Sequence, residues 1–233
     1  MFKSAKKMIL KMKNYITKSI VEFAKLLAFR YTKIFAPFYL YNVEPIQLAL
    51  LINEIERLKN ISGNIVEIGV ASGITTRFLC EHISCEHIEN TLTLYAVDTF
   101  TSFTKSDLDY EISNRGKSLF ELKGFGYNDY NIWVKNFSKY PFVKAIKADC
   151  SVLDYATIAP IKLVFLDVDL YLPTKNTLPK LYQSLVKGGV IVVDDIAANT
   201  TYDGAYQAFM EFCDARKITP KLIGNKCGVI YKQ

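Results

Sequence analysis

A stretch of ten residues, 64–73, limits the fold of this chain more than any other; it reads Asn-Ile-Val-Glu-Ile-Gly-Val-Ala-Ser-Gly. Its first half is dominated by β-branched apolar residues and predicts a buried strand. Gly69 then allows a sharp turn and a close approach between backbone and ligand. Gly73 precedes a helical pattern that begins near Thr75. A strand, a glycine turn and a helix N-terminus are together typical of a nucleotide site at the end of a parallel sheet.

The spacing of these glycines differs from that of the common nucleotide motifs. A dinucleotide site has G-x-G-x-x-G and a P-loop ends in G-K-[ST], whereas this turn reads Glu67-x-Gly69-x-x-x-Gly73 and has no lysine. Glu67 would repel a pyrophosphate, but it suits a ligand with a cationic amino group and hydroxyls, such as S-adenosylmethionine. We therefore predict a methyl-donor site; a plain tight turn and another nucleotide site are the alternatives. The predicted donor residues of this turn are Glu67, Gly69, Val70 and Gly73.

Acidic residues also follow the next two predicted strands. The apolar pattern of residues 91–97 ends on Asp98, and that of residues 143–148 ends on Asp149. An acid at the end of the second strand can accept hydrogen bonds from both ribose hydroxyls of an adenosine, and one after the third strand can reach the adenine. The alternative for Asp98 is that it only caps a turn. The donor residues predicted here are Asp98, Thr99, Phe100, Asp149 and Cys150, together with Asp167 at the end of the following strand.

Two further strands end on pairs of acids. The run 161–166 leads into Asp167 and Asp169, and the run 190–193 leads into Asp194 and Asp195. Carboxylate oxygens are the ligands that Mg²⁺ and Ca²⁺ take in proteins. We predict that Asp167, Asp194 and Asp195 hold a metal, and that Asp169, with Asp167 as second candidate, acts as catalytic base. The alternative is that some of these acids cap helices or bind only water.

The order of predicted elements indicates an α/β fold. Strand and helix patterns alternate through five cycles, which predicts a doubly wound, mostly parallel, Rossmann-like sheet. Residues 221–223 and 228–231 add two short strands, which we expect to be antiparallel at the sheet edge and to complete seven strands. The carboxyl ends of parallel strands share one rim, so the acids named above should meet there.

Charge separates the first part of the chain from the rest. The net charge is +6, and residues 1–36 contain nine basic residues against one acid, which is +8 and leaves −2 for the remainder. A general nucleic-acid-binding surface is therefore not expected. Apolar residues recur every three or four positions in this segment, which predicts one or two amphipathic helices. One interpretation is a helical arm that packs on the domain, covers the site or mediates a homodimer. A second is a helix that lies on an anionic membrane surface. A third is disorder, mainly of the first dozen residues.

These patterns predict an arm at residues 1–43 and a catalytic domain at residues 44–233, with an aromatic-rich insertion at about 100–140 that we interpret as a lid. The five cysteines are odd in number and lack a C-x-x-C pair, which indicates reduced thiols. No apolar run is long enough for a membrane span or a signal-peptide core. We expect a cytoplasmic protein, with peripheral attachment to the inner membrane face as the alternative.

Four segments of the sequence resemble the macrocin-type (TylF-like) O-methyltransferases, class I enzymes that methylate sugar hydroxyls in antibiotic and glycan pathways. The most specific similarity is D-x-D-L-Y in one segment together with D-D in another. The resemblance implies Mg²⁺ at Asp167 or Asp169 with Asp194 and Asp195, and S-adenosylmethionine around Glu67, Gly69 and Asp98. Two features depart from the family: Ala71-Ser72 replaces a bulkier pair, and the lid has no histidine. The four segments are residues 63–70, 165–174, 188–195 and 205–212.

The sequence thus predicts an S-adenosylmethionine-dependent, Mg²⁺-assisted O-methyltransferase. Its acceptor is expected to be a hydroxyl of a sugar-like or other small natural-product or glycan molecule. Two alternatives remain: methylation of a phenolic small molecule, for which the aromatic lid would supply stacking, and a non-catalytic scaffold that keeps the nucleotide fold and is recruited to a membrane surface by residues 1–36.

Overall fold

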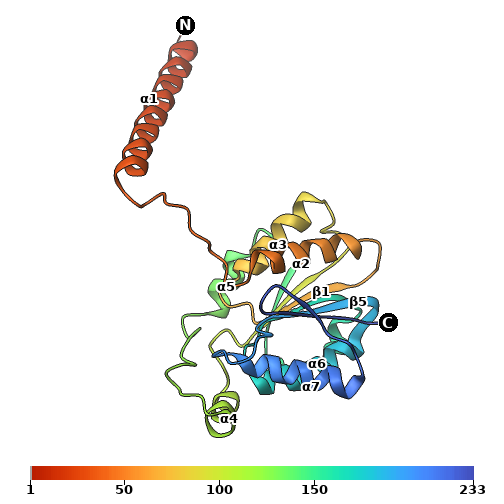
Figure 1. Ribbon diagram of the computed structural model, residues 1–233. Coiled ribbons are helices and arrows are strands. Elements are labelled where there is room, and N and C mark those ends of the chain that lie inside the picture. The colour runs from red at the N-terminus through yellow and green to blue at the C-terminus, as the bar shows by residue number, and fades with distance from the viewer. Residues whose placement is uncertain (1) are drawn as a thin grey trace. The chain divides into compact units, whose positions relative to one another are not determined.

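The computed structural model describes residues 2–233, with side chains from Lys11 onward. The chain divides into two units, Met1–Leu40 and Tyr41–Gln233. The first unit consists of α1 (Phe2–Tyr31) and a short irregular segment (Figure 1). The sequence left one or two helices open here, and the structure has one continuous helix. The predicted apolar positions before Lys11 lie outside the described side chains. Among residues 2–233, no helix is both long and apolar enough to cross a membrane.

The second unit is built on a seven-stranded sheet with the order β3-β2-β1-β4-β5-β7-β6 (Figure 1). The strands β1 to β5 are parallel to one another, whereas β7 is antiparallel to both β5 and β6. This arrangement confirms the predicted fold, including its antiparallel C-terminal edge. The strands are β1 (Asn64–Ile68), β2 (Leu94–Asp98), β3 (Val143–Lys147), β4 (Ile161–Leu166), β5 (Leu185–Val193), β6 (Lys221–Ile223) and β7 (Cys227–Tyr231).

Helices cover both faces of the sheet (Figure 1). On one face lie α2 (Pro45–Arg57) and α3 (Ile74–Cys85), and on the other lie α6 (Tyr171–Ser184) and α7 (Asp203–Arg216). Because successive strand residues point to opposite faces, Ile65 belongs to the buried cluster that contains Leu51 of α2, and Val66 belongs to the one that contains Phe209 of α7. The remaining helices are α4 (Lys105–Arg115), α5 (Tyr130–Asn136) and a 3-10 turn, η1 (Tyr155–Ile158).

The start of α2 follows the signal in the sequence. Pro45 occupies the first turn, where its missing N–H costs no helical hydrogen bond. Glu44 and Gln47 form a capping box, in which the Gln47 side-chain oxygen accepts a hydrogen bond of 2.6 Å from the Glu44 backbone N–H. Both side chains of this box also reach toward the rim of the sheet, so the helix start contributes to the site described below.

The glycine pair Gly188-Gly189 lies within a strand and not in the turn that its sequence predicts. Its two glycines predict a turn before the fifth strand, but β5 already begins at Leu185. Ile161 pairs with Leu185 and Leu163 pairs with Val190, so the residues between them form an irregularity within the strand. The positive φ of Gly188, 76°, accommodates it without the strain that a side chain would add.

Gly69 fixes how closely β1 and β4 approach at the rim. Its φ is +83°, and a Cβ atom built on it would lie 1.6 Å from the backbone oxygen of Asp167. No side chain fits this position without moving the backbone that carries Asp167. The glycine is therefore required by the packing of two chain segments against each other.

We expect Gly69→Ala to lower the free energy of unfolding by at least about 2 kcal/mol, because it adds both a left-handed strain and a clash with backbone. Gly124→Ala is the matched control, since a Cβ at Gly124 would meet nothing within 4 Å. Urea unfolding of the three proteins measures the difference. Equal stabilities of the two variants would contradict the proposed constraint.

Candidate active site

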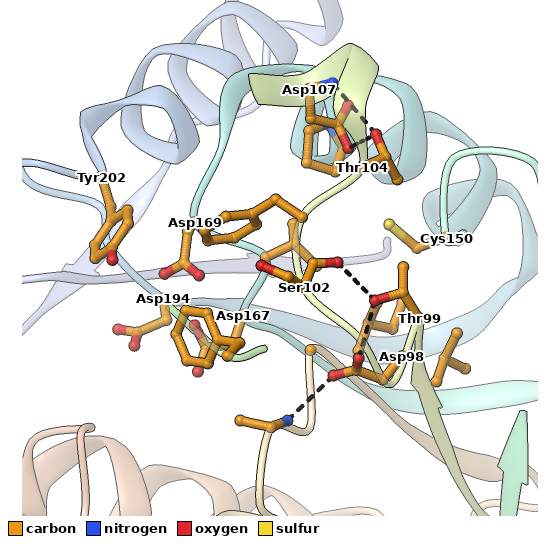
Figure 2. Close-up of a pocket in the computed structure, with 18 of the residues that line it drawn as sticks. Asp98, Thr99, Ser102, Thr104, Asp107, Cys150, Asp167, Asp169, Asp194 and Tyr202 are labelled. Carbon is orange, nitrogen blue, oxygen red and sulfur yellow. Dashed lines mark hydrogen bonds between the residues drawn. The ribbon is translucent and has the colours of Figure 1, made fainter. Parts of the chain in front are cut away.

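A cavity of about 380 Å³ opens at the carboxyl ends of the parallel strands, a size suited to a small-molecule ligand. Figure 2 shows its two ends, with Asp98 and Thr99 on one side and Asp167, Asp169 and Asp194 gathered on the other. We call the first the donor end and the second the acidic end. The donor end comprises Asp98, Thr99, Asp149 and Cys150, and the acidic end comprises Asp167, Asp169, Asp194 and Asp195.

Asp98 connects the loops that form the donor end. One carboxylate oxygen accepts hydrogen bonds from the backbone N–H groups of Val70 (2.9 Å) and Ala71 (3.1 Å), which belong to the glycine turn. The other oxygen accepts a bond of 2.6 Å from the Phe100 N–H. Backbone donors at three points hold the carboxylate in one orientation. Figure 2 shows Asp98 at the cavity wall.

The acidic end brings together side chains from two neighbouring strands. Asp167 follows β4, and Asp194 and Asp195 follow β5; each offers one carboxylate oxygen, and the three lie within 4.8 Å of one another. Burial raises the pKa of Asp167, and the neighbouring Asp194, Asp169 and Asp195 raise it further. Burial likewise raises the pKa of Asp169, together with a hydrogen bond and charge repulsion from Asp195.

Backbone strain is concentrated at the same rim. Asp169 and Asp195 have φ values of +62° and +60°, in the left-handed region that non-glycine residues rarely occupy. Phe100 and Ala71, which flank the donor end, share this feature with φ values of +54° and +45°. Such strain persists where the surrounding structure enforces it, and it is frequent at functional sites.

Lys226 is a cavity residue that the sequence analysis did not identify. Its Nζ lies 2.9 Å from Asp194 Oδ2 and 3.0 Å from Asp195 Oδ1. Although burial lowers the pKa of Lys226, the two carboxylates raise it above the usual value overall. The signal lay in the topology: β7 pairs antiparallel with β5, with Gly228 opposite Val193, which places the preceding turn at the carboxyl end of β5.

Two further contacts brace Asp194 and the turn that carries Lys226. The Gln47 amide, which is fully buried, donates a hydrogen bond of 2.6 Å to Asp194 Oδ1. The Glu44 carboxylate accepts hydrogen bonds from the backbone N–H (2.9 Å) and the side-chain amide (2.6 Å) of Asn225. The first turn of α2 thus fixes both a carboxylate of the acidic end and the loop that supplies its lysine.

Four predicted donor residues do not line the cavity: Glu67, Val70, Gly73 and Phe100. Glu67 lies on the face of β1 that α3 covers, and it is 1% exposed. Val70 and Phe100 are buried in the core, where the Phe100 ring contacts Tyr130 and Trp133. A Cβ at Gly73 would lie 2.6 Å from the Phe137 ring. Their roles in donor binding stay predictions.

The structure divides the aromatic residues of the predicted lid into two groups. Phe103 and Phe125 line the cavity with their ring centroids 5.5 Å apart, and Tyr202 lies 6.4 Å from Phe103. Trp133 and Phe137 instead stack at 4.0 Å within the core. The first group gives the cavity an apolar wall next to the acidic end, where Figure 2 shows Tyr202 beside Asp169.

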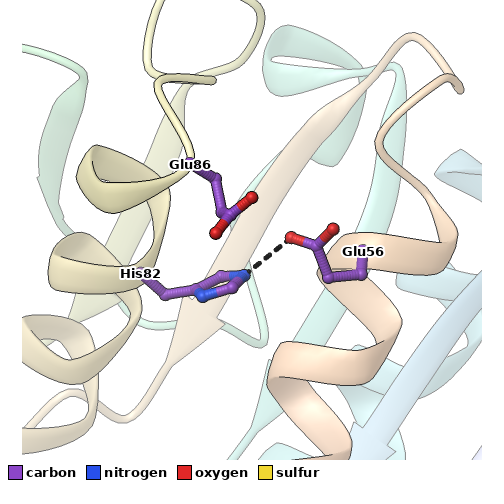
Figure 3. Close-up of side chains that lie close together, drawn as sticks. All are labelled: Glu56, His82 and Glu86. Carbon is purple, nitrogen blue, oxygen red and sulfur yellow. Dashed lines mark hydrogen bonds and ion pairs between the residues drawn. The ribbon is translucent and has the colours of Figure 1, made fainter.

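A second group of ionisable side chains lies outside the cavity and joins α2 to α3 (Figure 3). His82 Nε2 is 2.9 Å from Glu56 Oε1, and Glu86 completes a set whose potential ligand atoms lie within 4.8 Å of one another. Glu56 also pairs with Lys59 at 3.4 Å. These contacts account for the group as a link between the two helices.

Comparisons with known proteins agree with this architecture. Residues 46–233 match the sequence profile of the macrocin-O-methyltransferase (TylF) family. No curated protein sequence matches the chain significantly. The O-methyltransferase NovP superposes with a TM-score of 0.64 at 20% identity, over 80% of this chain and 79% of that one.

A second similar protein is the calicheamicin methyltransferase CalS11. One of its structures gives a TM-score of 0.62 at 16% identity, over 79% of this chain and 78% of that one. An apo structure, described as a TDP-rhamnose 3'-O-methyltransferase, gives 0.59 at 16% identity, over 92% and 93%. At these identities the likeness of the structures establishes the fold alone.

The burial of Glu67 leads to a prediction about stability and pH. Burial raises the pKa of Glu67 from 4.5 to about 8, so between these values the folded protein binds a proton that the unfolded chain has lost. Stability from this group is therefore greatest at low pH and falls as the pH rises, by up to about 1.4 kcal/mol per pH unit. Glu67→Gln should lose less stability than the wild type between pH 5 and 8, measured by urea unfolding.

Glu22→Gln serves as the control for this experiment, because Glu22 is exposed and pairs with Lys25 on α1. It should follow the wild-type profile. Parallel profiles for Glu67→Gln and the wild type would contradict the assignment of a proton to Glu67 in the folded state.

Proposed function

Because the chain belongs to the macrocin O-methyltransferase family, we propose that this O-methyltransferase transfers a methyl group from S-adenosylmethionine to a hydroxyl of a sugar-like acceptor, with Mg²⁺. The observation that carries the proposal is the presence of the donor end and the acidic end in one cavity. The description of CalS11 as a TDP-rhamnose 3'-O-methyltransferase supports a sugar acceptor.

The donor end suits the adenosine part of the methyl donor. Three backbone N–H groups orient the Asp98 carboxylate, and a carboxylate retains further lone pairs for ribose hydroxyls. The Thr99 hydroxyl donates to the backbone oxygen of Ser102 at 2.7 Å, which fixes the loop beyond β2. Asp149 and Cys150 form the neighbouring wall. Burial raises the pKa of the Cys150 thiol to about 11, so the thiol is neutral and suited to contact the adenine ring.

The acidic end fits a divalent cation. Asp167, Asp194 and Asp195 provide three hard oxygen ligands within 4.8 Å of one another, the donor set that Mg²⁺ prefers. When bound, Mg²⁺ would polarise the acceptor hydroxyl and lower its pKa. Positive charge there would also offset the repulsion that raises the pKa of Asp167.

Asp169 is the proposed catalytic base. It lines the cavity beside the three metal-ligand candidates, and its raised pKa makes it a stronger proton acceptor than an exposed aspartate. The acceptor O–H bond breaks as the proton passes to the Asp169 carboxylate, and the oxygen forms a bond to the methyl carbon. The carbon–sulfur bond of the donor breaks, and the electron pair stays on sulfur as S-adenosylhomocysteine.

We assign acceptor binding to the apolar wall. Phe103, Phe125 and Tyr202 present ring surfaces to the cavity next to Asp169, and Asn42 adds an amide that can hydrogen-bond a hydroxyl. Two of the rings belong to the segment at about residues 100–140, which we propose as a lid over the acceptor. A phenolic acceptor would use the same rings for stacking, so both acceptor classes belong in the assay.

Two variants separate donor binding from chemistry. Asp98→Ala should weaken binding of S-adenosylhomocysteine at least about 100-fold, because it removes both the ribose acceptor and the bond network of the loops. Asp169→Asn should bind S-adenosylhomocysteine like the wild type but lose methyl transfer to nucleotide sugars at least about 100-fold. Calorimetry measures the first quantity, and transfer of a labelled methyl group measures the second.

Asp109→Ala is the matched control, since this aspartate is exposed and pairs with Lys105 on α4; it should change neither quantity. A folded wild type that does not bind S-adenosylhomocysteine would overturn the proposed donor site. Transfer to phenols but not to sugars would reassign the acceptor. Full activity of Asp169→Asn would exclude Asp169 as the base.

Lys226 gives a test of the metal. It contacts Asp194 and Asp195, so it competes with a cation for their oxygens. Lys226→Met should lower the stability of the metal-free protein by about 2 kcal/mol, less than for a fully buried pair because Lys226 is a quarter exposed. Mg²⁺ should then raise the melting temperature of this variant more than that of the wild type.

Lys221→Met, at an exposed position of β6 in the same hairpin, is the control and should respond to Mg²⁺ like the wild type. If Mg²⁺ shifts the melting temperature of none of the proteins, the metal site is excluded. If it shifts all of them equally, Lys226 does not compete with the ion.

A further inference from the structure

The helix α1 carries a continuous apolar stripe that is exposed to solvent. Its members recur at spacings of three and four, so they share one side of the helix. Their exposed fractions range from 41% for Leu27 to 63% for Ile20. We call these five residues the apolar stripe: Met12, Ile16, Ile20, Phe23 and Leu27. Formation of the helix alone does not bury these side chains, and a contiguous exposed apolar surface of this kind is unusual.

Three lysines lie on the side of α1 opposite the apolar stripe. Lys11, Lys18 and Lys25 follow one another at intervals of seven residues, nearly two helical turns, and therefore lie along one line. Glu22 on the same side pairs with Lys25 at 2.9 Å. Between Lys11 and Leu27, the apolar stripe and the three lysines thus lie on opposite sides of the helix over about 24 Å.

We propose that α1 binds an anionic lipid surface, with the apolar stripe in the headgroup boundary and the lysines toward the lipid phosphates. A helix with one apolar side, a lysine-rich polar side and low overall hydrophobicity is the kind that lies in a membrane interface. Basic residues near the surface add electrostatic attraction to anionic lipids. Because α1 is covalently joined to the catalytic unit, its binding would hold the methyltransferase at the surface.

Charge argues against two other occupants of the stripe, a second copy of α1 and a nucleic acid. A second copy of α1 would bring two strongly basic helices together, since residues 1–36 have nine basic residues and one acid, and a helical dimer is favoured by opposite charges beside its apolar seam. A nucleic acid would use the lysines but would leave the apolar stripe in water. An anionic lipid surface satisfies both sides of the helix.

The test is co-sedimentation of the full-length protein with vesicles of phosphatidylcholine containing about one third phosphatidylglycerol, compared with phosphatidylcholine alone. The wild type should bind the anionic vesicles and lose most of that binding in high salt. The double variant Ile16→Ser, Ile20→Ser should reduce the partition coefficient at least about tenfold, because it removes two apolar side chains from the stripe.

The matched control is the double variant Val21→Ser, Phe29→Ser. These residues are exposed on the same helix, at 45% and 69%, but lie off the stripe. It removes similar apolar surface and should bind within about threefold of the wild type. Circular dichroism of each full-length variant checks that helix content is kept.

Three outcomes would overturn the proposal. The first is that the wild type fails to bind anionic vesicles. The second is that the stripe variant and its control bind equally, which would make the interaction purely ionic. The third is that light scattering shows concentration-dependent dimers that the stripe variant abolishes while vesicle binding is absent; a second copy would then be the occupant.

Discussion

Mutual repulsion among four carboxylates is the physical problem around which the rim of this sheet is built. Asp167, Asp169, Asp194 and Asp195 line one end of a single cavity, and burial together with their shared charge raises the pKa values of Asp167, Asp169 and Asp194. Uncompensated, such a group would destabilise the fold. The chain offsets the repulsion with contacts from distant segments: the Lys226 ammonium from the β6–β7 turn and the Gln47 amide from the start of α2.

Much of this arrangement could be predicted from the sequence, because it follows from simple periodicity. Apolar runs that end in acids, separated by helices, predict a parallel sheet with carboxylates on one rim. Asp98, Asp149, Asp167 and Asp194 do lie at that rim and line the cavity. The family resemblance, whose most specific part includes Asp167 and Asp194, is confirmed by the match over residues 46–233. Local sequence is sufficient here, since each acid is placed by the strand directly before it.

Contacts across elements could not be predicted in the same way. Lys226 reaches Asp194 only because β7 pairs antiparallel with β5 in one particular register, and a short terminal strand does not reveal its register. Glu67 was read as a ligand from its motif, but strand alternation directs it toward α3, away from the cavity. Phe100 is likewise adjacent to Asp98 in sequence, yet it turns into the core against Trp133. Packing sets the direction of these side chains, and their roles in donor binding stay predictions.

The two ends of the cavity are held by different kinds of interaction, and this difference fits the proposed reaction. At the donor end, Asp98 is bound by backbone N–H groups that move only if the loops move. At the acidic end, Asp194 and Asp195 are neutralised in part by Lys226, whose ammonium is carried on a flexible four-carbon side chain. In the proposed reaction, a rigid donor site would keep the methyl group in place, and an exchangeable counter-charge would let the carboxylates stay stable without a metal and still bind one. The lysine thereby reconciles the stability of the rim with its proposed chemistry.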